Sequence, residues 1–324
     1  MAQGMKSVVI VGAGQLGSRH LQALKGVATP LDIEVVDPSP DALRVARERY
    51  DAVTTPVPHR IAFSARREKP GAVDVAIVAT GSKVRRAAME ALLAGEVRAM
   101  ILEKLLFANR ADYAPMAQRL AAKGAPRTWV NCPMRVMPPY QAIREELGRG
   151  PVHYRVTGSQ FGLVTNAIHY LDHLAHLSGC IEYALDTSGL DSAPVESKRP
   201  GYLEVNGTLA ARFADGSRCE MTCFATGTMP VVVEICNDKR RYIVRESEGK
   251  LWQSAEESKW AWQERDAPIP FQSQMTTRLV EAILATGDCG LTPFAESVPV
   301  HLALLEPLAK FLGARSAQVD YPFT

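Results

Sequence analysis

The sequence lacks several patterns that mark particular classes of protein. Its six cysteines are scattered and form no CxxC pair, which excludes the dense disulfide framework of a small secreted domain. The longest apolar runs, VVIVGA and DVAIVAT, are strand-sized and fall well short of the roughly 18 residues that suggest a membrane span. The segment MAQGMKSVVIVG enters a strand without the features of a secretory leader. We therefore expect a cytoplasmic protein that does not enter a membrane.

Strong charge of one sign is also lacking. The net charge of +2 argues against a protein held on nucleic acid by phosphate neutralisation. The distribution is uneven, because residues 1–131 carry 19 lysines and arginines against 12 acids, whereas the remainder carries 18 against 23. A basic first part suits a polyanionic cofactor, and solvated surface charge explains it equally well.

Two domains are expected from the length of 324 residues and from a change of rhythm along the chain. Residues 1–131 alternate apolar, strand-like runs with amphipathic segments, which is typical of an α/β domain with a doubly wound parallel sheet. Residues 132–324 contain a helix and then, from about residue 202, strands in quick succession with turns at ADGS and NDKR. Closely spaced strands indicate a largely antiparallel sheet, and hence a second domain of the α+β type.

A glycine-rich turn follows the first expected strand. In VVIVGAGQLGSRH, Gly12, Gly14 and Gly17 form a GxGxxG pattern between a strand and a helix, which is the arrangement that binds the pyrophosphate of a dinucleotide. Asp37 stands 20 residues after Gly17, at the end of the next strand. A carboxylate there can bind both ribose hydroxyls and would repel a 2′-phosphate, so NAD(H) is favoured over NADP(H). The alternative is a turn whose glycines are only structural.

Together with this turn, the segments VDVAIVATGSKVRRAAMEALLAGEVRAMILEKLL and NAIHYLDHLAHLSG resemble the Gfo/Idh/MocA family of oxidoreductases over nearly the whole chain. The resemblance implies a Rossmann domain followed by a domain with an open, largely antiparallel sheet. It also implies oxidation or reduction of a carbinol on sugars, cyclitols and related compounds with a nicotinamide cofactor.

The first motif departs from the family in part. The Thr-Pro pair with a nearby histidine that follows strand four is matched by Thr80, whereas Gly81 and Arg85 depart from it. The turn still suits the ribose and nicotinamide of the cofactor. The glycine turn and the resemblance together imply cofactor contacts from Gly12, Gly14, Gln15, Leu16, Gly17, Asp37, Thr80, Gly81 and Glu103.

A second motif, Glu-Lys-Pro with its lysine beside the nicotinamide, appears as Glu103, Lys104 and Leu105. Family members commonly have a cis peptide before that proline. Because a cis bond before leucine would cost about 3 to 4 kcal/mol, we expect a trans bond here. The resemblance implies a catalytic role for Lys104; the alternative is an exposed lysine at the end of a strand, paired with Glu103.

A third motif, Asp-x-x-x-His-x-x-Asp on a helix of the second domain, is matched by His169 and Asp172. Position 165, where the leading acid would stand, is a threonine, and neither Thr165 nor Asn166 supplies the charge of a carboxylate. The resemblance implies proton transfer by His169, and the alternative is a histidine satisfied within a domain interface. Candidate substrate contacts are Arg135, from an Arg-x-x-Pro segment, Asn166 and Tyr170.

Three histidines on the same expected helix resemble a metal site. His169, His173 and His176 fall on one helical face, but the outer two are separated by about 10.5 Å along the axis at 1.5 Å per residue. Two nitrogens on one zinc ion lie within roughly 4 Å of each other. A zinc site would also need a further ligand, and the sequence has no HExxH motif to supply one. We predict no metal and regard His173 and His176 as packing or surface residues.

The sequence thus predicts an NAD(H)-dependent oxidoreductase that transfers a hydride to or from a carbinol carbon of a sugar or sugar derivative. Lys104 and His169 would hold the reacting hydroxyl and move its proton. The substrate class includes nucleotide-linked and surface-polysaccharide sugars, and the expected partner is a second copy of the chain in a homodimer or homotetramer. Two alternatives are an NAD(H)-binding sensor or scaffold without catalysis and a metal-dependent hydrolase.

Overall fold

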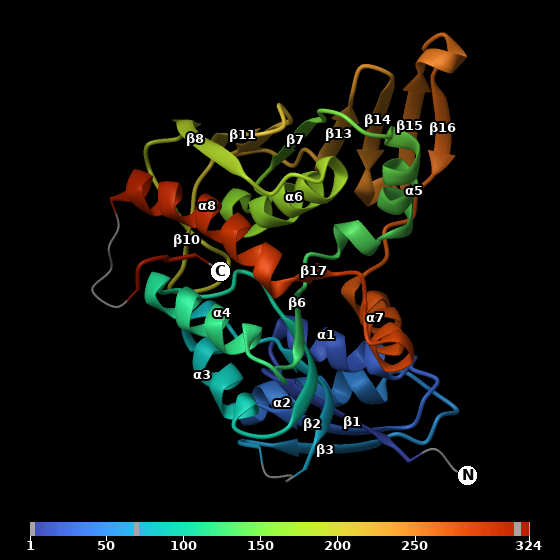
Figure 1. Cartoon of the computed structure of the whole chain (residues 1–324), viewed down its shortest axis with the longest axis vertical. Coiled ribbons are helices and arrows are strands. Elements are labelled where there is room, and N and C mark those ends of the chain that lie inside the picture. Colours follow the sequence, from blue (N-terminus) through green and yellow to red (C-terminus); the bar gives the residue numbers. More distant parts are fainter. Residues whose placement is uncertain (1–3, 68–70, 314–318, 324) are drawn as a thin grey trace. The chain divides into compact units, whose positions relative to one another are not determined.

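The computed structural model describes residues 4–67, 71–313 and 319–323, and it divides into two compact units that are described separately (Figure 1). The first unit consists of Met1–Phe107, Ala111–Asn131 and Pro270–Phe294. The second unit consists of Ala108–Arg110, Cys132–Ile269 and Ala295–Thr324. Residues 270–294, which the sequence groups with the second domain, therefore belong to the first unit.

The first unit is built on a sheet with the strand order β17-β6-β5-β4-β1-β2-β3. Its strands are parallel except β17, which pairs antiparallel with β6. The central strands β1 and β4 are almost continuous apolar runs, as expected where helices cover both faces of a sheet. The strands are β1 (Lys6–Val11), β2 (Leu31–Val36), β3 (Arg60–Ser64), β4 (Val73–Val78), β5 (Val97–Leu102), β6 (Arg127–Val130) and β17 (Thr292–Pro293).

Helices α1 (Gln15–Leu24), α2 (Pro40–Asp51), α3 (Ser82–Leu93) and α4 (Tyr113–Ala121) connect parallel strands of this sheet, with a 3₁₀ turn at Arg110–Asp112 before α4. A fifth helix of this unit, α7 (Gln272–Thr286), precedes the antiparallel strand β17. Helix α7 packs along α1, where the Thr277 hydroxyl donates to the carbonyl of Ala23 at 2.6 Å. This long-range return of the chain explains why a local pattern did not assign residues 270–294 to the first unit. The predicted Rossmann-like α/β fold is confirmed.

The second unit is built on a sheet with the order β16-β15-β14-β13-β7-β12-β11-β8. Neighbouring strands are antiparallel except β7 and β12, so the predicted largely antiparallel sheet is confirmed. Along β12, Cys219, Met221 and Cys223 are buried and alternate with more exposed residues. The strands are β7 (His153–Ser159), β8 (Tyr183–Leu190), β11 (Gly207–Phe213), β12 (Arg218–Phe224), β13 (Val232–Cys236), β14 (Arg240–Arg245), β15 (Lys250–Ala255) and β16 (Gln263–Asp266).

Helix α6 packs against β12 and positions the histidine segment. The helices of this unit are α5 (Pro138–Leu147), α6 (Leu163–Ser178) and α8 (Phe294–Leu312), with 3₁₀ turns at Pro133–Val136, Glu246–Glu248 and Glu256–Ser258. A short hairpin of β9 (Val195–Glu196) and β10 (Leu203–Glu204) stands beside α6. None of the helices in the described part of the chain has the length and apolarity that a membrane crossing requires.

Candidate functional site

The glycine turn between β1 and α1 has the shape that the sequence predicts. Gly12 has a φ of 96°, and a Cβ on it would lie 2.9 Å from the carbonyl carbon of Ala79. A Cβ on Gly17 would lie 1.8 Å from the carbonyl oxygen of Gly12. A Cβ on Gly14 would instead meet no described atom within 4 Å. Two glycines thus permit tight backbone packing, and the third leaves open space at the N-cap of α1.

Asp37 follows β2 and lies beside this turn. Its carboxylate accepts from the backbone N–H of Ala13 at 2.7 Å and from that of Ser39 at 2.8 Å. These bonds hold the carboxylate of Asp37 at the glycine turn. The exposed Gln15 begins α1, followed by the half-buried Leu16, and Arg49 of α2 donates to the Gln15 side chain at 3.0 Å.

A buried arginine joins the two other segments that the resemblance assigns to the cofactor. Thr80 follows β4, and Gly81 is the N-cap of α3. The Arg85 guanidinium donates to the carbonyl oxygens of Thr80, Leu105 and Leu106, the last at 3.0 Å. Sequence comparison identifies Arg85 only as a departure from a motif. In the structure it fixes the turn after β4 to the segment after β5.

The peptide bond between Lys104 and Leu105 is cis, so the expected trans bond is wrong. The expectation rested on the general preference of non-proline peptides for trans. It could not include the tertiary surroundings, in which Leu105 is buried and its carbonyl accepts from Arg85. Lys104 is itself buried, at 5% exposure, so it is not the exposed lysine of the alternative interpretation.

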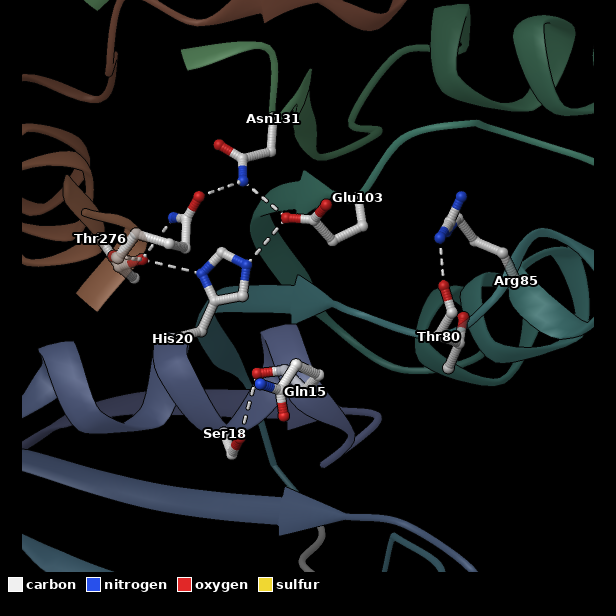
Figure 2. Close-up of polar contacts among 9 residues, drawn as sticks. Gln15, Ser18, His20, Thr80, Arg85, Glu103, Asn131 and Thr276 are labelled. Atoms are coloured by element: carbon white, nitrogen blue, oxygen red, sulfur yellow. Dashed lines mark hydrogen bonds and ion pairs between the residues drawn. The ribbon is translucent and has the colours of Figure 1, made fainter. Parts of the chain in front are cut away.

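Glu103 lies in a buried polar network that sequence reasoning did not predict (Figure 2). Its Oε1 accepts from the Nδ2 of Asn131 at 2.6 Å and lies 2.9 Å from the Nε2 of His20 on α1. The Nδ1 of His20 lies 2.8 Å from the hydroxyl of Thr276 on α7, and Asn131 also donates to Gln272. The network links α1, the end of β5 and α7, so Glu103 anchors the segment that carries Lys104.

The charge of Glu103 is maintained in this buried position. Burial by itself would raise the pKa of the carboxyl. The hydrogen bond and charge of His20, the hydrogen bond from Asn131 and the charge of Lys104 outweigh burial and hold the pKa at about 2. Glu103 is therefore a carboxylate at neutral pH, adjacent in sequence to Lys104.

On α6, the second and third histidines are occupied by neighbouring side chains. His173 is fully buried, and its Nδ1 lies 3.0 Å from the Tyr154 hydroxyl. Arg135 and Arg144 both bond to the ring of His176, Arg135 at 2.6 Å from Nδ1. Burial, followed by the charges of these arginines, lowers the pKa of His176 to about 3, so the ring is neutral at neutral pH. Among the described residues, no cluster of three or more His, Cys, Asp or Glu side chains could hold a metal.

Glu204, on strand β10, places a carboxylate beside the start of α6, where the third motif lacks its leading acid. His169 is half-buried and Asp172 is buried on α6. One carboxylate oxygen of Glu204, on β10, accepts from the backbone N–H of Val164 at 2.8 Å. The other accepts from the N–H of Thr165 at 2.9 Å and from the Thr165 hydroxyl. The carboxylate of Glu204 is therefore bonded to Thr165, which stands one helical turn before His169 in place of the leading acid of the motif.

The remaining candidate substrate contacts differ in their surroundings. The Nδ2 of Asn166 donates to the carbonyls of Phe161 and Gly162, at 2.5 and 3.2 Å. Tyr170 is buried beside the rings of Tyr154 and Phe161, with centroids 6.3 and 6.4 Å away. Burial raises the pKa of Tyr170 far above its ordinary value, which favours packing over proton relay.

No protein-family model matches the sequence, and no curated protein matches it at a significant level. Solved structures do match it over almost their full length. An oxidoreductase from Agrobacterium radiobacter in complex with NAD+, L-tartaric acid and magnesium superposes with a TM-score of 0.74 at 16% identity, covering 96% of this chain and 97% of that one. UDP-N-acetylglucosamine 3-dehydrogenase from Acidithiobacillus ferrooxidans gives 0.70 at 15% identity, covering 94% and 97%.

A structure of different function also matches. The super-repressor mutant of Gal80p from Saccharomyces cerevisiae gives a TM-score of 0.68 at 12% identity, covering 96% of each chain. At these identities the likeness establishes the fold, which oxidoreductases and a repressor share. The chain therefore has the two-domain fold of these solved structures, a Rossmann-like domain and a domain with a largely antiparallel sheet, which is the fold that the resemblance in its sequence predicts.

Proposed function

We propose that this chain is an NAD(H)-dependent oxidoreductase that transfers a hydride between the nicotinamide and a carbinol carbon of a sugar or sugar derivative. The observation that carries the proposal is the glycine turn, which is closed at Gly12 and Gly17 and open at Gly14. The fold is consistent with it, because sugar-nucleotide and inositol dehydrogenases have the same architecture. The finer substrate class proposed is a nucleotide-linked or surface-polysaccharide sugar.

The cofactor would be held by residues of the first unit. The backbone of Gly14, Gln15 and Leu16 would face the pyrophosphate, Asp37 the adenosine ribose, and Thr80 and Gly81 the nicotinamide half. When bound, the cofactor supplies or accepts the hydride. We propose NAD(H) over NADP(H), because the Asp37 carboxylate would repel a 2′-phosphate.

The proton would be handled by Lys104 and His169. An ammonium, or a neutral amine after deprotonation, can donate to or accept from a substrate hydroxyl, and an imidazole can do the same near neutral pH. The ionised Glu103 anchors the lysine segment, and the Glu204 carboxylate holds the helix end before His169. His173 and His176 remain neutral and bonded to other side chains, and His169 is the histidine of α6 that matches the catalytic motif of the resemblance.

Absorbance at 340 nm with a panel of sugars and sugar nucleotides, in both reaction directions, tests the activity. Lys104→Met and His169→Asn should each lower kcat/KM about 100-fold or more, while NADH affinity stays within about threefold. Lys123→Met and His153→Asn change exposed residues of the same types and should leave kcat/KM unchanged. Equal loss of activity in these controls would contradict the assigned roles.

The cofactor preference has its own test. Asp37→Ser removes the carboxylate and should shift the ratio of NADH to NADPH affinity by about tenfold or more toward NADPH, measured by fluorescence titration. Equal weakening of both cofactors would instead assign Asp37 to holding the turn through Ala13 and Ser39.

A sensor or scaffold that binds NAD(H) without turnover is the second candidate. The departures at Leu105 and Thr165 favour it, and the fold is shared with the repressor Gal80p. Glu204 argues against a sensor or scaffold, because its carboxylate is bonded to Thr165, where the leading acid of the motif would stand. Tight NADH binding without any absorbance change across the panel, together with ligand binding that Lys104→Met and His169→Asn leave intact, would establish the second candidate.

A further inference from the structure

A pocket of about 560 Å³ lies within the second unit beside the first turn of α6. Its walls come from residues 160–162 before the helix, from Thr165 and Asn166 on the helix, and from the β9–β10 hairpin. The volume falls within the range of small-molecule sites in proteins, roughly 300–1,000 Å³. Thr165 and Asn166 also place the pocket about one helical turn from His169.

The neutral part of the lining suits a ligand with several hydroxyl groups. Gln160 donates its Nε2 to the carbonyl of Gly227 at 2.9 Å, and Asn166 uses its Nδ2 in the same way toward Phe161. Their amide oxygens can therefore accept from hydroxyls. Asn206 accepts from the Cys223 thiol through its Oδ1, so its amide nitrogen can donate. Acceptors and donors around one pocket match a polyol better than an apolar ligand.

The charged part of the lining favours an anion. Lys198 and Arg199 form the end of the hairpin and line the pocket. Of the two acids there, Glu204 already binds two N–H groups and a hydroxyl at the start of α6. In the hairpin register Glu196 pairs with Leu203 and Glu204 with Val195, so Glu196 alternates to the other face from Glu204, and the exposed Glu196 also lines the pocket. Lys198 and Arg199 supply the positive charge that an anionic group of a ligand would meet.

We propose that this pocket binds the acidic end of a polyhydroxylated substrate, with a carboxylate or phosphate at Lys198 and Arg199 and hydroxyls at Gln160 and Asn166. The inference rests on the proposed oxidoreductase function and narrows its substrate to acidic sugar derivatives. Thr165 in the pocket wall and His169 are four residues apart on α6, so their side chains lie about 6 Å apart on one face of the helix.

Isothermal titration calorimetry tests the proposal. The ligands are D-glucose, D-glucuronate and D-glucose 6-phosphate and the three corresponding galactose compounds, and each is titrated with and without saturating NADH. The wild-type chain should bind at least one acidic sugar about tenfold or more tightly than its neutral counterpart. Lys198→Gln combined with Arg199→Gln should abolish that preference and change affinity for the neutral sugars less than about threefold. Comparing the glucuronate and phosphate arms identifies which anion the pocket takes.

The matched control combines Lys239→Gln with Arg212→Gln, which removes two exposed charges of the same unit away from the pocket. This control should keep the wild-type preference. Equal binding of neutral and acidic sugars, a preference that survives in the pocket variant, or no binding of any of the six compounds would each overturn the proposal. A separate NADH titration of the wild-type chain distinguishes the two proposals. If the chain binds no NADH but still binds acidic sugars more tightly than neutral ones, only the oxidoreductase proposal is contradicted.

Discussion

Helices α1 and α6 begin in similar ways, but their N-terminal turns have different partners. Each follows a glycine at the N-cap position, Gly14 for α1 and Gly162 for α6. The N-cap of α1 makes no side-chain capping bond, and its first turn holds no acid. At α6, the Glu204 carboxylate accepts from two backbone N–H groups. The positive end of a helix attracts anions in both cases.

The difference indicates how one physical feature serves two purposes. At α1 a Cβ on Gly14 would meet no described atom within 4 Å, so an anion from outside the chain has room beside the N–H groups of the first turn. At α6 the chain supplies the anion itself, and a Cβ on Gly162 would lie only 3.3 Å from the Glu204 Oε1. We therefore expect α1 to bind the cofactor phosphates, whereas the start of α6 is a fixed part of the pocket wall.

The largest expected effect on stability comes from substituting Gly17, and it distinguishes Gly17 from Gly14 at the start of α1. Gly17→Ala forces a Cβ against the backbone of Gly12 and should lower the free energy of unfolding by about 3 kcal/mol or more, with loss of NADH binding. Gly14→Ala meets no described protein atom and should change stability by less than about 1 kcal/mol, while NADH affinity falls about tenfold or more. Urea unfolding and NADH fluorescence titration measure both. Unchanged NADH affinity in Gly14→Ala would place the phosphates elsewhere.

A smaller expected effect on stability concerns the network in which Glu103 contacts His20 of α1. Glu103 has a folded-state pKa of about 2 against an ordinary 4.5. Because the folded value is depressed, its contribution to stability is complete above pH 4.5 and is lost as pH falls toward 2. The change should be about 3 kcal/mol at most.

Urea unfolding between pH 2 and pH 5 measures this contribution. Glu103→Gln should reduce the loss of stability over that range, whereas Glu96→Gln, at an exposed acid of the same unit, should lose stability with falling pH as the wild type does. An unaltered acid dependence in Glu103→Gln would show that the network with His20 and Asn131 does not depend on the charge of the carboxylate.

Local patterns predicted the glycine turn but not the partners of α6. Gly17 packs against Gly12, five residues before it, and Asp37 after β2 bonds to Ala13 after β1, so spacing alone placed these residues at one turn, whereas the contact of Gly12 with Ala79 is long-range. Glu204 lies 39 residues from Thr165, and Thr276 lies 256 residues from His20. Pairs at such separations form only through the tertiary fold.

The placement of α7 has the same explanation. The general preference for trans bonds predicted the wrong isomer for the peptide before Leu105. Helix α7 has an ordinary amphipathic pattern, which does not indicate the sheet against which the helix packs. By contrast, alternating strands and helices predicted the first fold class and closely spaced strands the second, because both patterns depend only on neighbouring residues.

The smallest expected effect tests whether Glu204 replaces an acid at position 165. Glu204→Gln leaves at least one N–H at the start of α6 facing another donor and should lower the free energy of unfolding by about 2 kcal/mol. Adding Thr165→Asp returns a carboxylate to the first turn and should recover part of that stability. Glu196→Gln, on the opposite face of the same hairpin, should change stability by less than about 0.5 kcal/mol.

Activity measurements distinguish two roles of Glu204: holding the start of α6 and acting on His169 through its negative charge. If the carboxylate acts on His169, Glu204→Gln should shift the pH profile of kcat/KM, and the variant with both Glu204→Gln and Thr165→Asp should shift it back. A purely structural Glu204 would change stability without moving the profile. Failure of Thr165→Asp to restore either property would mean that the start of α6 depends on the position of Glu204 on β10, and that the carboxylate is not exchangeable between the two sites.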